Sequence, residues 1–365
     1  MTLSTIAALL AGLVLLVGGA EALVKSASRL AATVGISPLV IGLTVVAFGT
    51  SAPELAVSLQ AGLSNQAGVA LGNVVGSNIC NVLLILGISA IIAPLAVAHQ
   101  IVRLDVPIMI GVSGLIVLFG WDGQMGRSDG VILFLGGLAY TLFLVYQSRR
   151  NPDSSVQDEY AQFGDRAHSW KQVGSNGILL AVGLAMLIGG SQLLIDSAVK
   201  IATLLGASPL IIGLTVVALG TSLPELATSV TASFRGESDI AVGNVVGSNI
   251  FNILVVLGLS SAVSPSGITV SPQAIAFDMP VMLAVAIACL PICITHSKIS
   301  RGEGVLLLVY YLLYIGYLGF NLTHENSPIP NWTGLIIVPL TLLTLAIAGW
   351  HFWRQAQHRQ SLNQQ

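Results

Sequence analysis

Long runs of apolar residues, separated by short polar segments, repeat along the whole chain. A helix of about 20 apolar residues crosses a bilayer, so each such run predicts one transmembrane helix. The runs are continuous and lack the period-two alternation of a transmembrane β-barrel. The expected fold class is therefore an all-α membrane protein, a polytopic helix bundle. Eleven spans are predicted, near residues 4–23, 37–62, 68–93, 104–121, 130–147, 175–199, 208–233, 239–263, 273–295, 304–322 and 333–353.

Composition supports a membrane location and adds an orientation. Hydrophobic residues make up 54% of the chain and charged residues 8%, whereas a soluble domain carries roughly 25% charged residues. The lipid bilayer is the expected surrounding, and the net charge of −2 gives no basis for a nucleic-acid partner. With the N-terminus outside, all but two of the 14 Lys and Arg residues fall on the cytoplasmic side. Arg127 and Lys200 are the exceptions, so the C-terminus is expected in the cytoplasm.

The sequence overlays itself when it is shifted by 171 residues. Residues 37–58 match residues 208–229 at 18 of 22 positions, and residues 69–89 match residues 240–260 at 14 of 21. Similar apolar composition does not explain identical polar residues in register. The chain is therefore interpreted as two copies of one unit.

Each copy contains five predicted spans, and an odd number of spans makes the second copy enter the membrane upside down. Inverted repeats of this kind place a substrate site at the midplane, where the copies meet. The predicted organisation is a first repeat at residues 1–147, a cytoplasmic linker at 148–174, a second repeat at 175–322, an additional span at 333–353 and a cytoplasmic tail at 354–365.

A polar stripe lies on one helical face of the second span and again on the seventh. Its members are three or four residues apart, the spacing of neighbours on a helix. Each stripe contains a glutamate, although a carboxylate at membrane depth costs on the order of 3 kcal/mol or more. The stripes are Ala47, Thr50, Ser51, Glu54 and Ser58, and Ala218, Thr221, Ser222, Glu225 and Ser229.

A proline breaks each stripe, and the next span adds further oxygen atoms. Pro53 and Pro224 lack the N–H that would bond the carbonyl four residues earlier, so main-chain carbonyls become available as ligands. Glycines in the next spans would let these helices approach closely. The added side chains, at a spacing of four, are Asn73, Ser77 and Asn81, and Asn244, Ser248 and Asn252.

Carboxylate, hydroxyl, amide and carbonyl oxygens are the ligands that hard cations such as Ca²⁺ and Na⁺ prefer. A structural interpretation stays open beside this one. Ser, Thr and Asn often bond between membrane helices, and a buried carboxyl can be kept neutral by a bond to the opposite repeat. Asp105 and Asp278 lie near span ends, where interfacial caps are expected.

The motifs "GTSAPE" with "GNVVGSNICN", and "GTSLPE" with "GNVVGSNIFN", resemble the two repeats of the sodium/calcium exchanger family, in its bacterial type. The resemblance implies a Na⁺/Ca²⁺ antiporter with a central site, no enzyme activity and no cofactor. It also implies a prokaryotic inner-membrane protein, which is expected to act as a monomer. By motif position, the implied ion ligands are Glu54, Glu225, Thr50, Thr221, Ser51, Ser222, Ser77, Ser248, Asn81 and Asn252, with carbonyls from Ala47 and Ala218.

The chain departs from the family at one ligand position. Some members carry Asp where this chain has Asn252, so only two acidic groups remain here. H⁺/Ca²⁺ exchange and K⁺-dependent Na⁺/Ca²⁺ exchange are therefore alternatives.

Two other classes of function are less well supported. A channel would favour rings of acidic residues from several subunits, whereas inverted repeats favour a transporter. An intramembrane hydrolase would need a nucleophile or a water-activating metal set, and the stripes offer neither.

Overall fold

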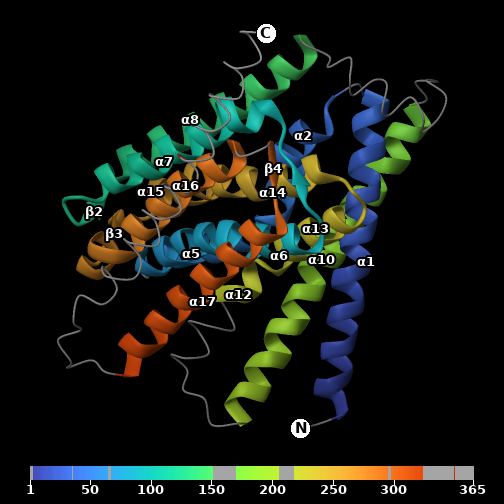
Figure 1. Ribbon diagram of the computed structural model, residues 1–365. Coiled ribbons are helices and arrows are strands. Elements are labelled where there is room, and N and C mark those ends of the chain that lie inside the picture. Colours follow the sequence, from blue (N-terminus) through green and yellow to red (C-terminus); the bar gives the residue numbers. More distant parts are fainter. Residues whose placement is uncertain are drawn as a thin grey trace.

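The computed structural model describes residues 3–34, 36–64, 67–150, 170–204, 218–294 and 297–323, and residue 349. This part of the chain is nearly all helical (Figure 1). The first half contains α1 (Leu3–Val34), α2 (Pro38–Ile41), η1 (Gly42–Val46), α3 (Ala47–Thr50), α4 (Ala52–Leu63), α5 (Ala67–Cys80), η2 (Asn81–Leu86), α6 (Gly87–Ile92), β1 (Leu95–Ala96), η3 (Ile101–Asp105), α7 (Val106–Phe119), β2 (Gln124–Met125) and α8 (Arg127–Arg150). The second half contains α10 (Trp170–Leu204), α12 (Ala218–Thr221), α13 (Leu223–Phe234), α14 (Ser238–Phe251), η6 (Asn252–Leu257), α15 (Gly258–Val263), β3 (Ile268–Thr269), η7 (Ala274–Asp278), α16 (Met279–Ile294), β4 (Lys298–Ile299) and α17 (Arg301–Thr323).

Eight of the eleven predicted spans match helices that can cross a membrane. Seven helices within the described residues have the required length and apolar character, and the bent pair Pro38–Thr50 and Ala52–Leu63 makes up to eight. The predicted span at 304–322 coincides with α17, which is not among these. The span at 208–233 is described only from residue 218, and the span at 333–353 lies outside the described residues apart from residue 349.

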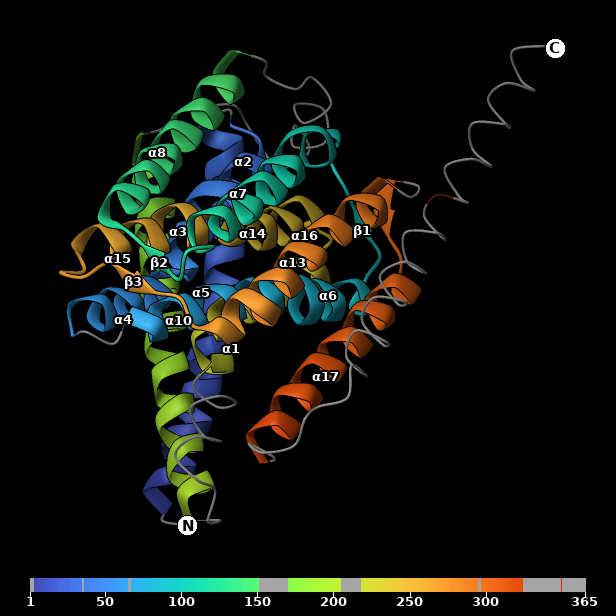
Figure 2. The same cartoon turned by 90° about the vertical axis from the view of Figure 1, so that its left-hand side faces the viewer.

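Helices α1 and α10 are the longest, and both views show them side by side (Figures 1 and 2). They cross antiparallel on glycines. A methyl group on Gly12 would lie 2.9 Å from the carbonyl oxygen of Gly190, and one on Gly19 would lie 2.8 Å from that of Gly183. Small residues let membrane helices approach this closely. The 171-residue shift turns one contact into the other, so the crossing has the symmetry of the repeat.

The two halves are also joined at the ends of the spans. Strand β1 pairs antiparallel with β4, and β2 pairs with β3, so each two-stranded sheet takes one strand from each half. Elsewhere α8 contacts α15, and α17 contacts α6. In both views α8 and α17 lie on opposite sides of the layer that contains α5 and α14 (Figure 2). Strand pairs and helix contacts thus join the two repeats at several places.

Burial separates the centre of the bundle from its surface. The span Ser238–Val263 is 94% buried and Gly68–Ile92 is 72% buried, against 28% for the spans of α1 and α10. The side chains of Leu10, Val14 and Leu142 are exposed, as expected for residues that face lipid. The two segments that carry the asparagines and Ser77 or Ser248 therefore form the core.

Candidate functional site

Both glutamates lie directly after a helix break. Ser51 ends α3 with φ −81° and ψ 10°, and Ser222 ends α12 with φ −88° and ψ 7°. Pro53 and Pro224 then stand in the first turn of α4 and α13. The first break bends the span by 48°. The predicted breaks are confirmed, and each leaves its glutamate at the N-terminal end of a new helix, where the helix dipole favours negative charge.

The glycine before Thr50 and the one before Thr221 each lie against a side chain of α10. A methyl group on Gly49 would lie 2.4 Å from a Leu184 methyl carbon, and one on Gly220 would lie 2.2 Å from the Ile195 side chain. Both partners belong to α10. The Gly220 carbonyl, which Pro224 cannot bond, accepts the Ser191 hydroxyl at 3.4 Å. The α10 helix therefore packs directly against both breaks.

The two carboxylates are tied to opposite halves. Ser51 donates to Glu225 Oε1 at 2.9 Å, and Ser222 donates to Glu54 Oε1 at 3.1 Å. Both glutamates are fully buried, with 0% exposure. Because each carboxylate bonds the serine three residues before the other, the inverted repeat brings Glu54 and Glu225 to one place at the centre of the bundle.

A second pair of mutual contacts surrounds the carboxylates. Thr50 donates to Asn244 Oδ1 at 3.1 Å, and Thr221 donates to Asn73 Oδ1 at 3.4 Å. The Asn73 amide donates to Ser58 Oγ and to the Glu54 carbonyl, and Asn244 does the same to Ser229 and the Glu225 carbonyl. These amides therefore hold the helix that carries each glutamate.

Several buried oxygens of the predicted ligand residues have no hydrogen-bond partner within the described part of the chain. They are Glu54 Oε2, Glu225 Oε2, Asn81 Oδ1, Asn252 Oδ1 and Ser248 Oγ. An unpartnered buried oxygen costs free energy, on the order of 1–3 kcal/mol for a neutral group and more for a charged one. All five belong to the predicted ligand residues, and all are of the kind that binds hard cations.

The remaining predicted ligand residues do not make matching contacts in the two halves. Ser77 donates to Glu54 Oε1 at 3.5 Å and accepts from Ser222 at 3.3 Å. The Ala47 carbonyl accepts the Ser51 N–H at 3.0 Å and lies 3.3 Å from the Thr50 hydroxyl, whose single proton it shares with Asn244 Oδ1. Ala218 begins α12.

A pair of asparagines that the sequence analysis passed over lies between the two central segments. Asn78 donates to the Asn249 carbonyl at 3.2 Å, and Asn249 donates to the Asn78 carbonyl at 3.2 Å. Their side-chain oxygens accept from Asn252 at 3.2 Å and from Asn81 at 3.0 Å. The signal was available, because Asn78 and Asn249 are identical polar residues in register in both copies.

The expectation for Asp105 is wrong. It is fully buried and does not cap α7. Its carboxylate accepts the Tyr140 hydroxyl at 2.8 Å and the Gln100 amide at 3.3 Å. Asp278 likewise accepts the Tyr314 hydroxyl, at 3.3 Å. These aspartates therefore link neighbouring helices of one half, away from the central carboxylates.

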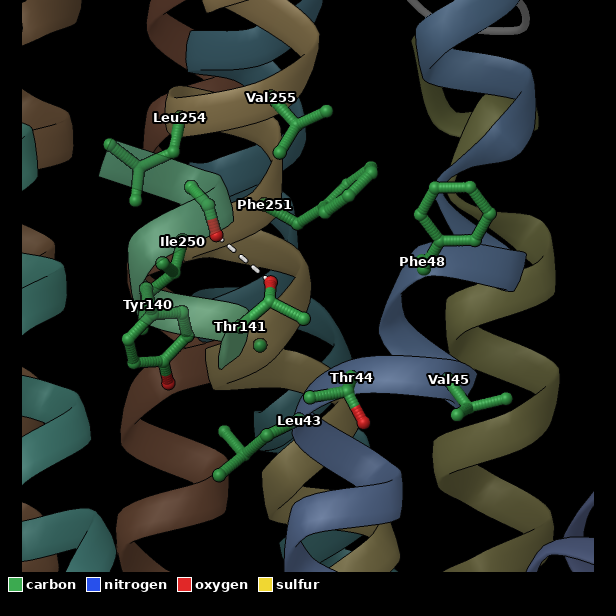
Figure 3. A pocket seen from close by; sticks show the side chains of 12 residues that line it. Leu43, Thr44, Val45, Phe48, Tyr140, Thr141, Ile250, Phe251, Leu254 and Val255 are labelled. Atoms are coloured by element: carbon green, nitrogen blue, oxygen red, sulfur yellow. Dashed lines mark hydrogen bonds between the residues drawn. The ribbon is translucent and has the colours of Figure 1, made fainter. Parts of the chain in front are cut away.

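A cavity of about 270 Å³ opens beside the broken span, between η1, α8 and the junction of α14 with η6 (Figure 3). Its lining is almost entirely apolar and includes Phe48, Ile250, Phe251 and Leu254. Without a carboxylate, this lining does not suit a hard cation. The oxygen-rich centre remains the candidate site.

Comparisons with known proteins identify the family of the chain. The family model described as sodium/calcium exchanger protein matches residues 4–149 and 175–320. The inner membrane protein YrbG of Escherichia coli is 40% identical over 325 residues, covering 87% of this chain and 97% of that protein. The sodium/calcium exchanger MaX1 of Methanosarcina acetivorans is 34% identical over 340 residues, covering 84% and 96%. A solved structure of the sodium-calcium exchanger NCX_Mj superposes with a TM-score of 0.75 at 32% identity, covering 87% of this chain and 100% of that one.

Proposed function

The chain belongs to the sodium/calcium exchanger family, and we propose that it exchanges Na⁺ for Ca²⁺, which Glu54 and Glu225 hold between them at the midplane. Membership of the family makes it an integral membrane protein and a cation/Ca²⁺ antiporter. MaX1 and the matched structure are exchangers by name, in line with a protein that is not an enzyme. The choice of Na⁺ and the site between the glutamates are the proposal.

One observation carries the proposal. There are two fully buried carboxylates, one in each half. One oxygen of each accepts a hydrogen bond from a serine of the opposite half. The other oxygen of each is among the buried oxygens without a partner in the described residues, together with those of Asn81, Asn252 and Ser248. A buried charge of −2 beside unpaired amide and hydroxyl oxygens suits one Ca²⁺ or two Na⁺ ions.

Charge balance explains why transport would be obligatory exchange. Two carboxylates without a counter-ion repel each other and are poorly solvated in a low dielectric, so an empty occluded state is costly. Either one Ca²⁺ or two Na⁺ removes this penalty. The two ions compete for one set of oxygens, and the protein changes sides only when that set is filled.

The fold supplies a route for alternating access. At the α1–α10 crossing, the repeat relates each contact to a second one, and the same holds at the carboxylates. In our proposal, each half can therefore adopt the conformation that the other half leaves. We propose repeats at residues 1–147 and 175–322 joined by a cytoplasmic linker, with the N-terminus outside and a monomer as the working unit. The Lys and Arg distribution supports this orientation.

Uptake of ⁴⁵Ca²⁺ into proteoliposomes tests the exchanged ion. Purified protein is reconstituted, and Na⁺, K⁺ and pH gradients are imposed one at a time. An outward Na⁺ gradient alone is expected to drive saturable Ca²⁺ uptake. Uptake driven by a pH gradient and indifferent to Na⁺ would replace Na⁺ by H⁺ in the proposal, and a requirement for K⁺ as well as Na⁺ would place the chain in the K⁺-dependent group.

A further inference from the structure

We propose that Asn78 and Asn249 are positioning residues that set the amide orientation of Asn81 and Asn252, each acting on the asparagine of the opposite half. This role rests on the proposed function, because it matters only if the oxygens of Asn81 and Asn252 bind the transported ion. The two residues touch no carboxylate in the described contacts. They act through other side chains.

The side-chain amide of Asn78 faces two groups that can only accept hydrogen bonds. The Nδ2 of Asn78 lies 3.2 Å from the Asn249 carbonyl and 3.9 Å from the Met282 sulfur. Neither a carbonyl nor a thioether sulfur can donate a hydrogen bond, so the amide nitrogen of Asn78 must face them. The side-chain oxygen of Asn78 must then face the opposite way.

The orientation passes on to Asn252. Asn78 Oδ1 can only accept, so the group 3.2 Å from it must be the Nδ2 of Asn252. A planar amide carries its oxygen opposite to its nitrogen. Asn252 Oδ1 is therefore turned away from Asn78, and it is one of the buried oxygens without a partner in the described chain.

The same relay runs in the other direction. Asn249 faces the Asn78 carbonyl at 3.2 Å and the Met109 sulfur at 3.5 Å, and its oxygen accepts from Asn81 at 3.0 Å. Asn81 Oδ1 is left unpaired in turn. With Asn78 or Asn249 removed, the partner amide could rotate by half a turn and present a donor to a cation. Partners that orient metal ligands typically contribute 10–100-fold to metal affinity.

Asn78 and Asn249 are held firmly in place by burial and by main-chain contacts. Asn78 and Asn249 are each 2% exposed, and each bonds the main chain of the other half. Asn81 and Asn252 begin the π-helical segments η2 and η6, a helix type that is frequent at functional sites. The four asparagines therefore fasten the two halves together at the point where two ligand oxygens are aimed.

The experiment is a double-mutant cycle on the Ca²⁺ concentration that half-saturates Na⁺-driven uptake. Asn78→Leu is expected to raise this concentration about 10-fold. The same change in an Asn252→Ala background should add less than about 2-fold, since the oriented amide is already gone. In an Asn81→Ala background it should add its full effect. Asn249→Leu should show the mirror pattern.

Two controls keep the result interpretable. Ser89→Ala and Ser260→Ala remove buried hydroxyls without partners in the described residues, from α6 and α15, and should leave half-saturation unchanged. Asn78→Asp keeps an acceptor for Asn252 and, when protonated, a donor for the Asn249 carbonyl, so it should weaken Ca²⁺ binding less than Asn78→Leu does. If Asn78→Leu does not reach the membrane, Asn78→Ala takes its place in the cycle.

The outcomes separate this role from the proposed function. An equal effect of Asn78→Leu in both alanine backgrounds would make the pair a structural cross-link and overturn the inference. So would an Asn78→Asp variant as weak as Asn78→Leu. If Asn81→Ala and Asn252→Ala leave half-saturation unchanged, the two amides are not ligands and the inference fails, while Na⁺-driven uptake by the unmodified protein still stands.

Discussion

Around the central carboxylates the two halves of the chain make nearly the same contacts, yet they differ in one hydroxyl. Glu54 Oε1 accepts from Ser222 and also from Ser77. Glu225 Oε1 accepts from Ser51, while the counterpart of Ser77, Ser248, has an unpartnered hydroxyl in the described chain. In the first half, the Ser77 hydroxyl thus bonds the carboxylate of its own half. In the second half, the equivalent Ser248 hydroxyl makes no such bond.

This difference divides the contacts of the site into those that have a counterpart in the other half and those that do not. The cross-half contacts of the glutamates with Ser51 and Ser222, and of Thr50 and Thr221 with the asparagines, occur in matched pairs, because the repeat maps each onto the other. Ser77 bonds Glu54 in its own half and Ser222 in the other half, and neither contact has a counterpart at Ser248. The site is therefore expected to respond equally to changes in the matched pairs and unequally to changes at Ser77 and Ser248.

The largest effect is expected from removing either carboxylate charge. Glu54→Gln and Glu225→Gln keep the side-chain shape but leave a charge of −1, which balances neither Ca²⁺ nor two Na⁺. Each should abolish ⁴⁵Ca²⁺ flux, by more than about 100-fold, with protein still present in the membrane. Substantial exchange in either variant would break the equivalence of the halves and the assignment of the site. Ser260→Ala, which changes a buried hydroxyl elsewhere, serves as the control.

A smaller effect is expected at the packing of the broken span. A methyl group on Gly247 would lie 2.7 Å from Leu43 Cα and 2.7 Å from the Leu43 carbonyl oxygen, so η1 would have to move. Gly247→Ala should reduce the free energy of unfolding by about 1–3 kcal/mol, measured by thermal unfolding in detergent. Gly111→Ala, whose methyl would meet no described atom within 4 Å, is the matched control.

Gly76 is the counterpart of Gly247 in the first copy of the repeat. By the same 171-residue shift the counterpart of Leu43 is Leu214, which lies outside the described residues. A loss of stability in Gly76→Ala equal to that in Gly247→Ala would show the same close packing on both sides. A neutral Gly76→Ala would show that the halves differ there.

The serines should give moderate and unequal effects. Ser77→Ala removes a long hydrogen bond to Glu54, so it should lower stability by less than about 1 kcal/mol and also weaken Ca²⁺ uptake. Ser248→Ala removes an unbonded hydroxyl, so it should raise half-saturating Ca²⁺ by roughly 3–10-fold without loss of stability. Identical stability changes in the two variants would contradict the asymmetry that the structure shows.

The smallest effect is expected at the periphery. Arg235 forms an ion pair with Glu21, and the two side chains are 36% and 50% exposed. The repeat places Ser64 and Gln192 at the equivalent positions, so this pair has no mate. Exposed pairs contribute less than about 1 kcal/mol, and Glu21→Gln should leave unfolding and uptake almost unchanged. A large change in uptake would show that a one-sided contact governs the transport cycle.

Much of the centre follows from sequence because the repeat preserves polar residues in register. The stripe positions of Thr50, Ser51 and Glu54 were predicted from helical spacing, and the structure places them together with their mates. Asn78 was not predicted because it lies one residue beyond Ser77, off the face that Ser77 and Asn81 define. Its partner is the same position of the other copy, and only the assembled fold brings the two together.

Two other features were not predicted: the tyrosines that bond Asp105 and Asp278, and the π-helical segments. The shift between the copies grows from 171 residues at the glutamates to 173 at the equivalent Asp105 and Asp278, because the segments between them differ in length. Tyr140 and Tyr314, which bond these aspartates, are therefore not matched by a fixed shift. The π-helical segments are invisible to a pattern read with a period of 3.6, because they change the face that a residue presents only locally.

The contacts between the halves are of the isologous kind: Asn78 meets its equivalent Asn249, and the contact of Gly12 with Gly190 is repeated by that of Gly19 with Gly183. Two separate, identical half-length chains inserted in opposite directions would make the same contacts. In such a dimer every substitution would occur twice. Joining the halves in one polypeptide removes that restriction, so single positions of one half can diverge from the other, as Glu21 and Arg235 have from Gln192 and Ser64.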